Sequence, residues 1–412
     1  MTSRISLTIG LSAFIWASTP RLSHTASVWI GTWESSPAGL PTMAKIGSLV
    51  VPPPATISGT VRFRLQISAG GNHIRLKVSN QYGNRALDIA SVSVGVAGDG
   101  LDATPGTLKR VTFARQIAIS LPAGASVLSD PVDLRVEPLA DLVVSLYIPH
   151  GVTVTEWPDT SSQTGPIVVD SFDATFLEHL RAPVGPWIRP IVSEVDVLSD
   201  RPYKVIVTLG DSITDGGIDA QTGARGWPGI LSRRVQAQNF SVVNAGIGGN
   251  RLLESKPPIF GASGLARLNQ DVFAVPGVSH VVVLEGINDI GSSGPGGRFG
   301  DTPILTPDEL ITGFTQIIER AHKHGIKVIG ATILPFEGAE YYSVEKESIR
   351  VAVNQWIRTS KDFDEIIDFD AALRDPANPT RLGPTYDSGD HLHPNLAGRH
   401  KMAAVVDVRI FQ

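Results

Sequence analysis

The sequence predicts two folded parts, an N-terminal antiparallel β-sandwich of the jelly-roll type and a C-terminal α/β domain with a parallel, doubly wound sheet. The first observation is length, since a chain of 412 residues exceeds what one hydrophobic core usually supports. The second is a change of pattern. Short polar–apolar alternations fill residues 27–200, whereas apolar β-branched runs alternate with helical segments in residues 201–412.

Residues 1–26 are expected to be a signal peptide. Arg4 precedes an apolar stretch that is too short to span a bilayer. Ala17 and Ala26 are candidate cleavage positions, although neither has a small residue two positions before it. An ordinary apolar N-terminus is the alternative interpretation. We therefore expect a secreted or periplasmic protein, in which no later segment is apolar enough to span a membrane.

The β-sandwich of residues 27–200 is predicted from runs in which polar and apolar residues alternate, because such runs give a sheet one wet and one buried face. The clearest of these runs are residues 61–68, 72–79 and 142–149. Turn signals separate the runs, among them Gly70-Gly71, Gly83-Asn84 and Pro122-Ala-Gly124. Long helical periodicity is nearly absent from this half of the chain.

The parallel sheet of residues 201–412 is predicted from five apolar runs with helical segments between them. The runs are residues 205–209, 241–244, 280–284, 327–332 and 365–368. The most regular helical segment covers residues 307–324 and is followed by Gly325. Asp308 and Glu309 in its first turn suit the positive end of a helix dipole, and the glycine suits a helix end.

Composition excludes several classes of function. The net charge of −5 is spread along the chain without long like-charged runs, which argues against nucleic acid or an anionic membrane surface as a partner. The chain has no cysteine, so a thiol nucleophile, a disulfide framework and a cysteine-ligated metal are excluded.

A serine stands where open α/β folds place their chemistry. The apolar run Val205–Leu209 ends at Gly210-Asp211-Ser212, and a buried parallel strand of this kind delivers the Ser212 hydroxyl to the carboxyl edge of the sheet. A serine hydroxyl needs a neighbouring base to become a nucleophile, and that base needs a carboxylate to orient it.

The segment Asp390-His-Leu-His393-Pro394 offers both of these groups. A separation of three residues in a turn lets Asp390 reach Nδ1 of His393. Pro394 is expected at the first position of the helix that follows. His391 is the nearest rival as a base. Three other histidines are expected on helix surfaces: His322, His324 and His400.

Two further strand ends carry groups that could stabilise an oxyanion. Residues 243–251 end a strand in a glycine cluster, which lets backbone N–H groups approach a ligand closely. A phosphate loop is the alternative, but the full dinucleotide spacing and a P-loop Lys are absent. Asn288 follows the strand at residues 280–284 and supplies an uncharged N–H donor. Its alternative role is to cap a turn.

These four blocks together resemble the SGNH hydrolase superfamily, also called GDSL esterases. The resemblance extends from about Lys204 to Val406 and implies a three-layer α/β/α, flavodoxin-like catalytic domain. The sequence departs from the family pattern at two places. Ile213 stands where leucine is expected, and the doubled glycine leaves Gly248 as a rival to Gly249 for the position of the family's glycine.

The resemblance also implies the roles of the site residues. Ser212 matches the nucleophile, and Asp390 and His393 match the other members of the catalytic triad. The oxyanion hole would consist of the N–H groups of Ser212 and Gly249 and the side chain of Asn288. Neither a metal nor a cofactor is expected, because the Asp390 segment lacks a second cluster with metal-ligand spacing.

The N-terminal region looks like the β-domain that precedes the catalytic domain in some secreted bacterial members. Residues 29–33 and 70–80 carry this looser match. Such a domain could pack against the catalytic sheet or bind a polymeric substrate, and packing is the more common role. The sequence leaves the oligomeric state open.

The predicted function is that of a serine esterase acting on carboxylic esters with short to medium acyl chains through an acyl-enzyme. The alternatives are a xylan-type polysaccharide O-deacetylase, a lipase or an acyltransferase on the same scaffold, and a non-catalytic binding protein with a decayed site. Residues 290–306 and 335–342 are expected to line the cleft. Three aromatic residues could form an acyl wall or belong to the core: Phe336, Tyr341 and Tyr342.

Overall fold

The computed structural model describes residues 27–40, 54–156, 172–180, 188–189, 191–255 and 260–412, and the backbone at residues 45–46, 49–50 and 167–169. The expected signal peptide, residues 1–26, lies outside the described residues. Within the described ranges, every helix is too short or too polar to pass through a bilayer.

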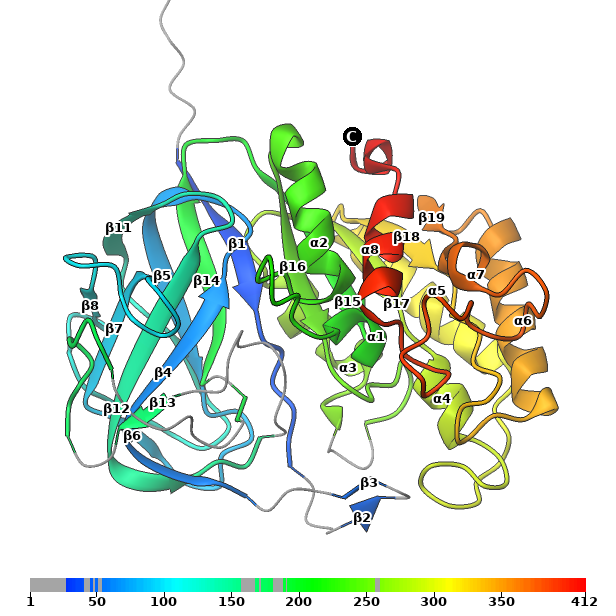
Figure 1. Ribbon diagram of the computed structural model, residues 1–412, viewed down its shortest axis with the longest axis horizontal. Coiled ribbons are helices and arrows are strands. Elements are labelled where there is room, and N and C mark those ends of the chain that lie inside the picture. Colours follow the sequence, from blue (N-terminus) through cyan, green and yellow to red (C-terminus); the bar gives the residue numbers. More distant parts are fainter. Residues whose placement is uncertain are drawn as a thin grey trace, which may run out of the picture.

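In the described part of the N-terminal half, two antiparallel sheets of five strands each pack together (Figure 1). The first sheet contains β1 (Val28–Glu34), β14 (Val192–Ser199), β5 (Gly71–Ser79), β10 (Ser126–Leu128) and β11 (Val132–Val136). The second contains β13 (Ile167–Val169), β4 (Thr56–Gln66), β12 (Asp141–Thr153), β7 (Ser91–Val96) and β8 (Lys109–Val111). Two short pairs are β2 (Lys45–Ile46) with β3 (Leu49–Val50), and β6 (Leu87–Ile89) with β9 (Ile119–Leu121). The predicted all-β character of this half is confirmed.

The described residues of the C-terminal half form a parallel sheet with the strand order β16-β15-β17-β18-β19. Its strands are β15 (Lys204–Gly210), β16 (Phe240–Gly246), β17 (Val278–Leu284), β18 (Lys327–Ala331) and β19 (Glu365–Ile367). They coincide with the five predicted runs. The side chains of Val205–Val207 and Leu209 are fully buried, as expected for a central strand that is covered on both faces.

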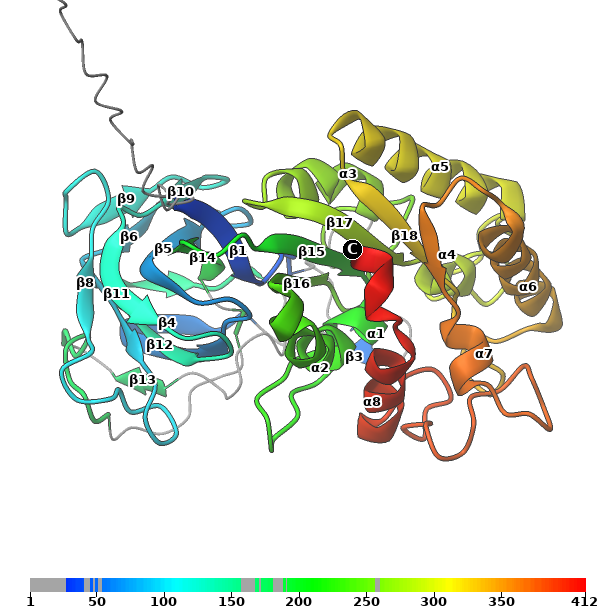
Figure 2. The same ribbon diagram turned by 90° about the horizontal axis from the view of Figure 1, so that it is seen from above.

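Helices cover both faces of this sheet, so the predicted α/β class is confirmed (Figure 2). The helices α5 and α6 lie on one face, and α2 and α8 lie on the other. Their bounds, with those of the shorter helices, are α1 (Ser212–Asp215), α2 (Gly226–Val235), α3 (Gly264–Leu268), α4 (Ile287–Ser292), α5 (Pro307–Lys323), α6 (Val344–Thr359), α7 (Phe369–Leu373) and α8 (Leu396–Val405). The single-turn elements among the described residues are η1 (Gln236–Gln238), η3 (Asn269–Phe273) and η4 (Val408–Phe411).

The helix predicted at residues 307–324 is α5, and its start is fixed more firmly than a dipole argument requires. The hydroxyl of Thr306 accepts a hydrogen bond from the Glu309 N–H at 3.4 Å, and the Glu309 carboxylate accepts one from the Thr306 N–H at 2.8 Å. This reciprocal capping box satisfies two N–H groups that a helix start otherwise leaves without partners.

The N-terminal β-region packs on the open edge of the catalytic sheet. Strand β1 runs beside the edge strand β16 in both views (Figures 1 and 2). The Ser68 hydroxyl accepts a hydrogen bond from the Val242 N–H of β16 at 3.2 Å, and the Ser241 hydroxyl donates to the Gly31 carbonyl of β1 at 2.7 Å. Since an uncovered edge strand is a site for unwanted pairing, this contact protects the edge of the catalytic sheet.

Candidate active site

Ser212 lies at the carboxyl end of β15, which pairs with the edge strand β16 in the catalytic sheet. β15 ends at Gly210, Asp211 is the N-cap of α1, and Ser212 is the first residue of that helix. The Asp211 carboxylate accepts a hydrogen bond from the Ile213 N–H at 2.8 Å, which fixes the turn. The sequence therefore predicts correctly that a strand end carries this hydroxyl to the sheet edge.

His393 is brought to Ser212 from 181 positions further along the chain. Its Nε2 lies 2.7 Å from the Ser212 Oγ. Its Nδ1 lies 2.5 Å from the carboxylate of Asp390, so the imidazole is held between a hydroxyl and a carboxylate. The structure thus joins the three residues in one hydrogen-bonded row.

Asp390 is itself held in place by the turn that it begins. One carboxylate oxygen accepts hydrogen bonds from the backbone N–H groups of Leu392 at 3.0 Å and His393 at 2.9 Å. Partial burial raises the pKa of Asp390, but the hydrogen bonds and the imidazole outweigh burial and leave this pKa well below its ordinary value. Asp390 is therefore ionised at neutral pH.

The rival base, His391, points to a different partner. Its Nδ1 lies 2.6 Å from the carboxylate of Asp387, and its backbone is in the left-handed region with φ 62°. The histidines expected on helix surfaces, His322, His324 and His400, are exposed.

The prediction for Pro394 is wrong. The helix α8 begins at Leu396, and its N-cap is Asn395, whose side-chain oxygen accepts a hydrogen bond from the Gly398 N–H at 3.0 Å. Asparagine is among the best N-cap residues, because its side chain satisfies an N–H group of the first turn. Pro394 lies one residue before that cap and belongs to the His393 turn.

The two other blocks lie against each other. The side-chain amide of Asn288, in α4, donates to the carbonyl oxygen of Asn250 at 3.0 Å. Gly249 directly precedes Asn250 and has a φ of 78°. A Cβ at position 249 would lie 2.4 Å from the ring of Phe260, so the chain requires glycine there. Gly248 has no such neighbour, since its nearest contact would be at 3.8 Å.

Two buried carboxyl groups, those of Asp211 and Asp289, are the chain neighbours of Ser212 and Asn288. The carboxylate of Asp289 accepts hydrogen bonds from the Leu252 and Leu253 N–H groups at 2.8 and 2.9 Å and so ties α4 to the loop after Gly249. Burial raises the pKa of Asp289 to about 6 against these hydrogen bonds. Burial likewise raises the pKa of Asp211 to about 7, opposed by the Ile213 N–H.

The raised pKa of Asp211 has a measurable effect on stability. Between its ordinary value of 3.8 and about 7, the folded protein binds more protons at this group than the unfolded chain does. The free energy of unfolding therefore falls as pH rises through this window. Asp211→Asn keeps an acceptor for Ile213 and cannot ionise. Urea unfolding should show the variant gaining stability relative to the unmodified protein from pH 4 to 7, and a constant difference above pH 7.

Asp362→Asn supplies the control for the loss of one carboxylate without burial, because Asp362 is exposed. A stability difference for Asp211→Asn that does not change between pH 4 and 8 would contradict burial as the cause.

A cavity of about 840 Å³ lies beside α4. Ser292, one turn after Asn288 on the same helix, lines it, and so does Arg251, the residue after Asn250. The other lining residues come largely from the predicted segment 290–306. They are the apolar residues Leu253, Phe299, Pro303, Ile304 and Leu305 and the polar residues Glu254, Asp289, Ser293, Thr302 and Glu309. The aromatic residues of the segment 335–342 do not line this cavity, and Phe336 is fully buried in the core.

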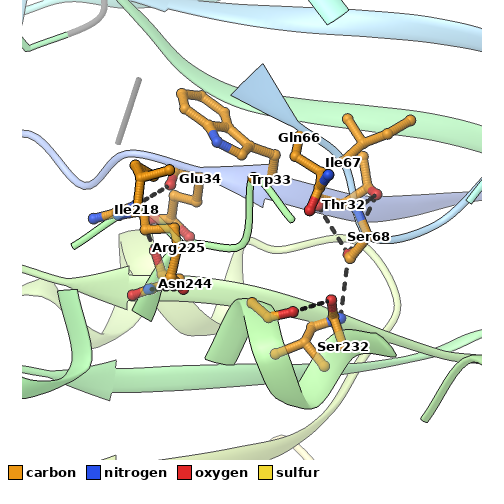
Figure 3. Close-up of a pocket in the computed structure, with 13 residues that line it drawn as sticks. Thr32, Trp33, Glu34, Gln66, Ile67, Ser68, Ile218, Arg225, Ser232 and Asn244 are labelled. Atoms are coloured by element: carbon orange, nitrogen blue, oxygen red, sulfur yellow. Dashed lines mark hydrogen bonds between the residues drawn. The ribbon is translucent and has the colours of Figure 1, made fainter. Parts of the chain in front are cut away.

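A second pocket, of about 40 Å³, lies between β1 and β4 of the N-terminal region and α2 and β16 of the catalytic sheet (Figure 3). Its volume holds only a few water molecules, at roughly 10–15 Å³ each, and is too small for an ester substrate. Arg225 lines this pocket and donates to the Glu34 carbonyl at 2.9 Å (Figure 3). It also forms an ion pair with Asp215 at the end of α1. The pocket is thus a gap in the contact between the two parts.

Among the described residues, no group of three or more His, Asp or Glu side chains has the arrangement of a metal site. Sequence reasoning missed Asn250, whose carbonyl accepts a hydrogen bond from the Asn288 amide, and Arg267, which donates to the Asn250 side chain. Asn250 stood next to the glycine cluster and could have been singled out. Arg267 lies in a segment without any motif.

The C-terminal half matches the model of the GDSL-like lipase/acylhydrolase family over residues 208–401. This range contains all five residues predicted for the site: Ser212, Gly249, Asn288, Asp390 and His393. No curated protein sequence matches the chain.

Several solved structures are similar to one half of the chain. An acetylxylan esterase, Axe2 from Geobacillus stearothermophilus, is 23% identical, with 50% of this chain and 94% of that chain covered and a TM-score of 0.37. An aryl esterase from M. smegmatis is 18% identical, with 51% and 100% covered and a TM-score of 0.37. A GDSL-like lipase from Bacteroides thetaiotaomicron is 19% identical, with 50% and 87% covered and a TM-score of 0.37. From the family match, the C-terminal half of this chain is a GDSL-like lipase/acylhydrolase domain, and the protein is a carboxylic ester hydrolase by class.

Proposed function

We propose that the protein is a serine esterase that hydrolyses esters of short to medium acyl chains through a covalent acyl-enzyme. The observation that carries this proposal is the hydrogen-bonded row from the Ser212 Oγ to His393 at 2.7 Å and from His393 to Asp390 at 2.5 Å. A serine, a base and an orienting carboxylate at these distances are what nucleophilic catalysis by a hydroxyl needs.

In the proposed reaction, His393 removes the proton from the Ser212 hydroxyl as the oxygen attacks the ester carbonyl carbon. The C–O bond to the alcohol then breaks, and His393 returns the proton to the leaving oxygen. Water enters, His393 removes its proton, and attack on the acyl carbon releases the acid and restores the serine hydroxyl. Asp390 stays ionised throughout, because its pKa lies well below the ordinary range.

The negative charge of each tetrahedral intermediate would be stabilised by three N–H donors. They are the backbone N–H groups of Ser212 and Gly249 and the side-chain amide of Asn288. The hydrogen bond from Asn288 to the Asn250 carbonyl at 3.0 Å supports this assignment, because it fixes the orientation of the amide beside the glycine loop.

The cavity beside α4 is the proposed seat of the acyl chain. Its volume of about 840 Å³ falls in the range of small-molecule sites, and Leu253, Ile304 and Leu305 give it apolar walls. A chain of several methylenes buried there would contribute to binding, at about 0.8 kcal/mol per methylene.

A panel of p-nitrophenyl esters from acetate to decanoate, assayed beside acetylated xylan, tests this proposal. The unmodified protein should hydrolyse the acetate to hexanoate esters, with undiminished rates in EDTA. Leu305→Trp places an indole in the cavity and should lower the ratio of kcat/KM for hexanoate to that for acetate by roughly tenfold, since a lost or blocked methylene site is worth about 1–3 kcal/mol.

Val351→Trp is the matched control, because Val351 is 51% exposed on α6 and does not line the cavity. This control should leave the ratio unchanged. An unchanged ratio in Leu305→Trp would show that the acyl chain does not bind in this cavity. Activity on acetylated xylan alone would contradict the esterase proposal and favour the deacetylase alternative.

A further inference from the structure

One buried arginine lies behind the proposed oxyanion hole. Arg267 belongs to the short helix α3, and its side chain is only 3% exposed. It donates five hydrogen bonds within the protein. The acceptors are the Gly210 carbonyl at 2.9 Å, the Ala245 carbonyl at 2.6 Å, the Asn250 side-chain oxygen at 2.9 Å, and the carboxylates of Asp271 at 2.9 Å and Glu285 at 3.3 Å.

These acceptors belong to the segments that carry the three proposed oxyanion donors. Gly210 stands two residues before Ser212, and Asn250 directly follows Gly249. Glu285 stands three residues before Asn288. One planar guanidinium group thus joins three segments that are otherwise separate strand ends of the sheet.

Asn250 connects Arg267 to the segments that carry Gly249 and Asn288. Its side-chain oxygen accepts from Arg267, and its side-chain nitrogen donates to the carbonyls of Phe260 at 2.6 Å and Ala262 at 2.9 Å. Its own carbonyl accepts from the Asn288 amide at 3.0 Å. Phe260 in turn contacts the place where a Cβ of Gly249 would lie. A shift of Asn250 would therefore move both the glycine loop and the Asn288 amide.

The buried groups around Arg267 suit an arginine better than a lysine. Its two carboxylate partners, Asp271 and Glu285, have side chains that are 3% and 0% exposed. Burial keeps the pKa of Glu285 well above its ordinary value. A lysine ammonium could meet one of these carboxylates but presents three donors on a flexible stem, whereas guanidinium presents five in a fixed plane.

We propose that Arg267 is a positioning residue that sets the geometry of the oxyanion hole by tying together the segments of Ser212, Gly249 and Asn288. This inference rests on the proposed function. Arg267 does not touch the substrate, so it acts on the rate of the chemical steps through the placement of the three N–H donors and leaves ground-state binding nearly unchanged.

The test compares Arg267→Lys with Arg350→Lys at equal concentrations of active, folded enzyme. Arg350 is a matched control, because its side chain is also 3% exposed and pairs with two carboxylates, Glu347 at 2.6 Å and Asp370 at 3.0 Å, away from the site. Both variants should lose thermal stability. Arg267→Lys should lower kcat on p-nitrophenyl acetate by roughly 10- to 10³-fold, with KM within about threefold, whereas Arg350→Lys should keep its kcat.

A double-mutant cycle with Asn288→Ala separates positioning from general loosening. Asn288→Ala alone should lower kcat by roughly 10²- to 10³-fold. If both residues act through one oxyanion hole, Arg267→Lys should add much less to the loss in the Asn288→Ala background than it causes alone. A boronic acid that binds Ser212 as a transition-state analogue should lose affinity in parallel with kcat/KM.

An unchanged kcat in Arg267→Lys, or full additivity in the cycle, overturns the inference. If Arg267→Lys does not fold, Asn250→Ala decides, because it removes the acceptor of Arg267 and keeps the backbone carbonyl that Asn288 needs. An unchanged kcat there overturns the inference as well. Failure of the proposed function is a distinct result, since Ser212→Ala would then retain activity whatever the Arg267 variants do.

Discussion

Replacing Ser212 with alanine is expected to lower kcat on p-nitrophenyl acetate by a factor on the order of 10⁶, the loss that removing the nucleophile causes in a serine protease. The alanine keeps the backbone N–H at position 212 and removes only the hydroxyl that lies 2.7 Å from His393. Any rate that remains should come from the oxyanion donors and from binding, and it should no longer pass through an acyl-enzyme.

Steady-state kinetics and a burst experiment measure this result, with Ser348→Ala as the control. Ser348 is an exposed serine of α6 whose hydroxyl donates to the Glu345 carbonyl at 2.6 Å, so its loss should leave kcat unchanged. A Ser212→Ala protein that keeps most of its turnover, or an initial burst of p-nitrophenol, would exclude Ser212 as the nucleophile.

The strands of the catalytic sheet could be predicted from the sequence because both faces of each strand are buried. Such strands appear as unbroken apolar runs, as Val205–Leu209 does, and each run ends where the chain leaves the sheet. The β-region was predictable for the opposite reason, since β5 alternates buried and partly exposed side chains. The pairing order of those strands depends on distant contacts and could not be predicted from local pattern.

The row formed by Ser212, His393 and Asp390 could be anticipated because its parts are local. A strand end fixes the serine, and a separation of three residues in a turn fixes the carboxylate against the imidazole. The predicted start of α8 is wrong, because Pro394 and Asn395 are both residues that suit a helix start. Only the hydrogen bond from the Gly398 N–H to the Asn395 side chain decides between them.

Arg267 could not be predicted, because its function depends on partners from four separate segments. In the sequence it is one arginine among several, in a stretch with ordinary helical composition. Its role follows only when the ends of β15, β16 and β17 come together and leave buried carbonyl and carboxylate oxygens that need donors.

The second large effect is expected for His393→Ala, which should lower kcat by a factor on the order of 10⁶, as the loss of the base does in a serine protease. His391→Ala is a closely matched comparison, since His391 lies two residues away and pairs with a carboxylate at 2.6 Å, but with Asp387. It should keep kcat within a few-fold. Comparable losses in the two variants would mean that folding of the turn, and not base catalysis, is what the substitution removes.

The pH profile of the unmodified protein is an independent test of His393 as the base. The pKa of Asp390 is held well below its ordinary value, so this carboxylate stays ionised wherever a histidine titrates. Activity measured as kcat/KM should therefore be lost as pH falls, because a protonated imidazole cannot accept the serine proton. A rate that stays flat to pH 5 would show that another group accepts the serine proton. In the His393→Ala protein, the residual rate should lack the loss of activity that protonation of this imidazole causes.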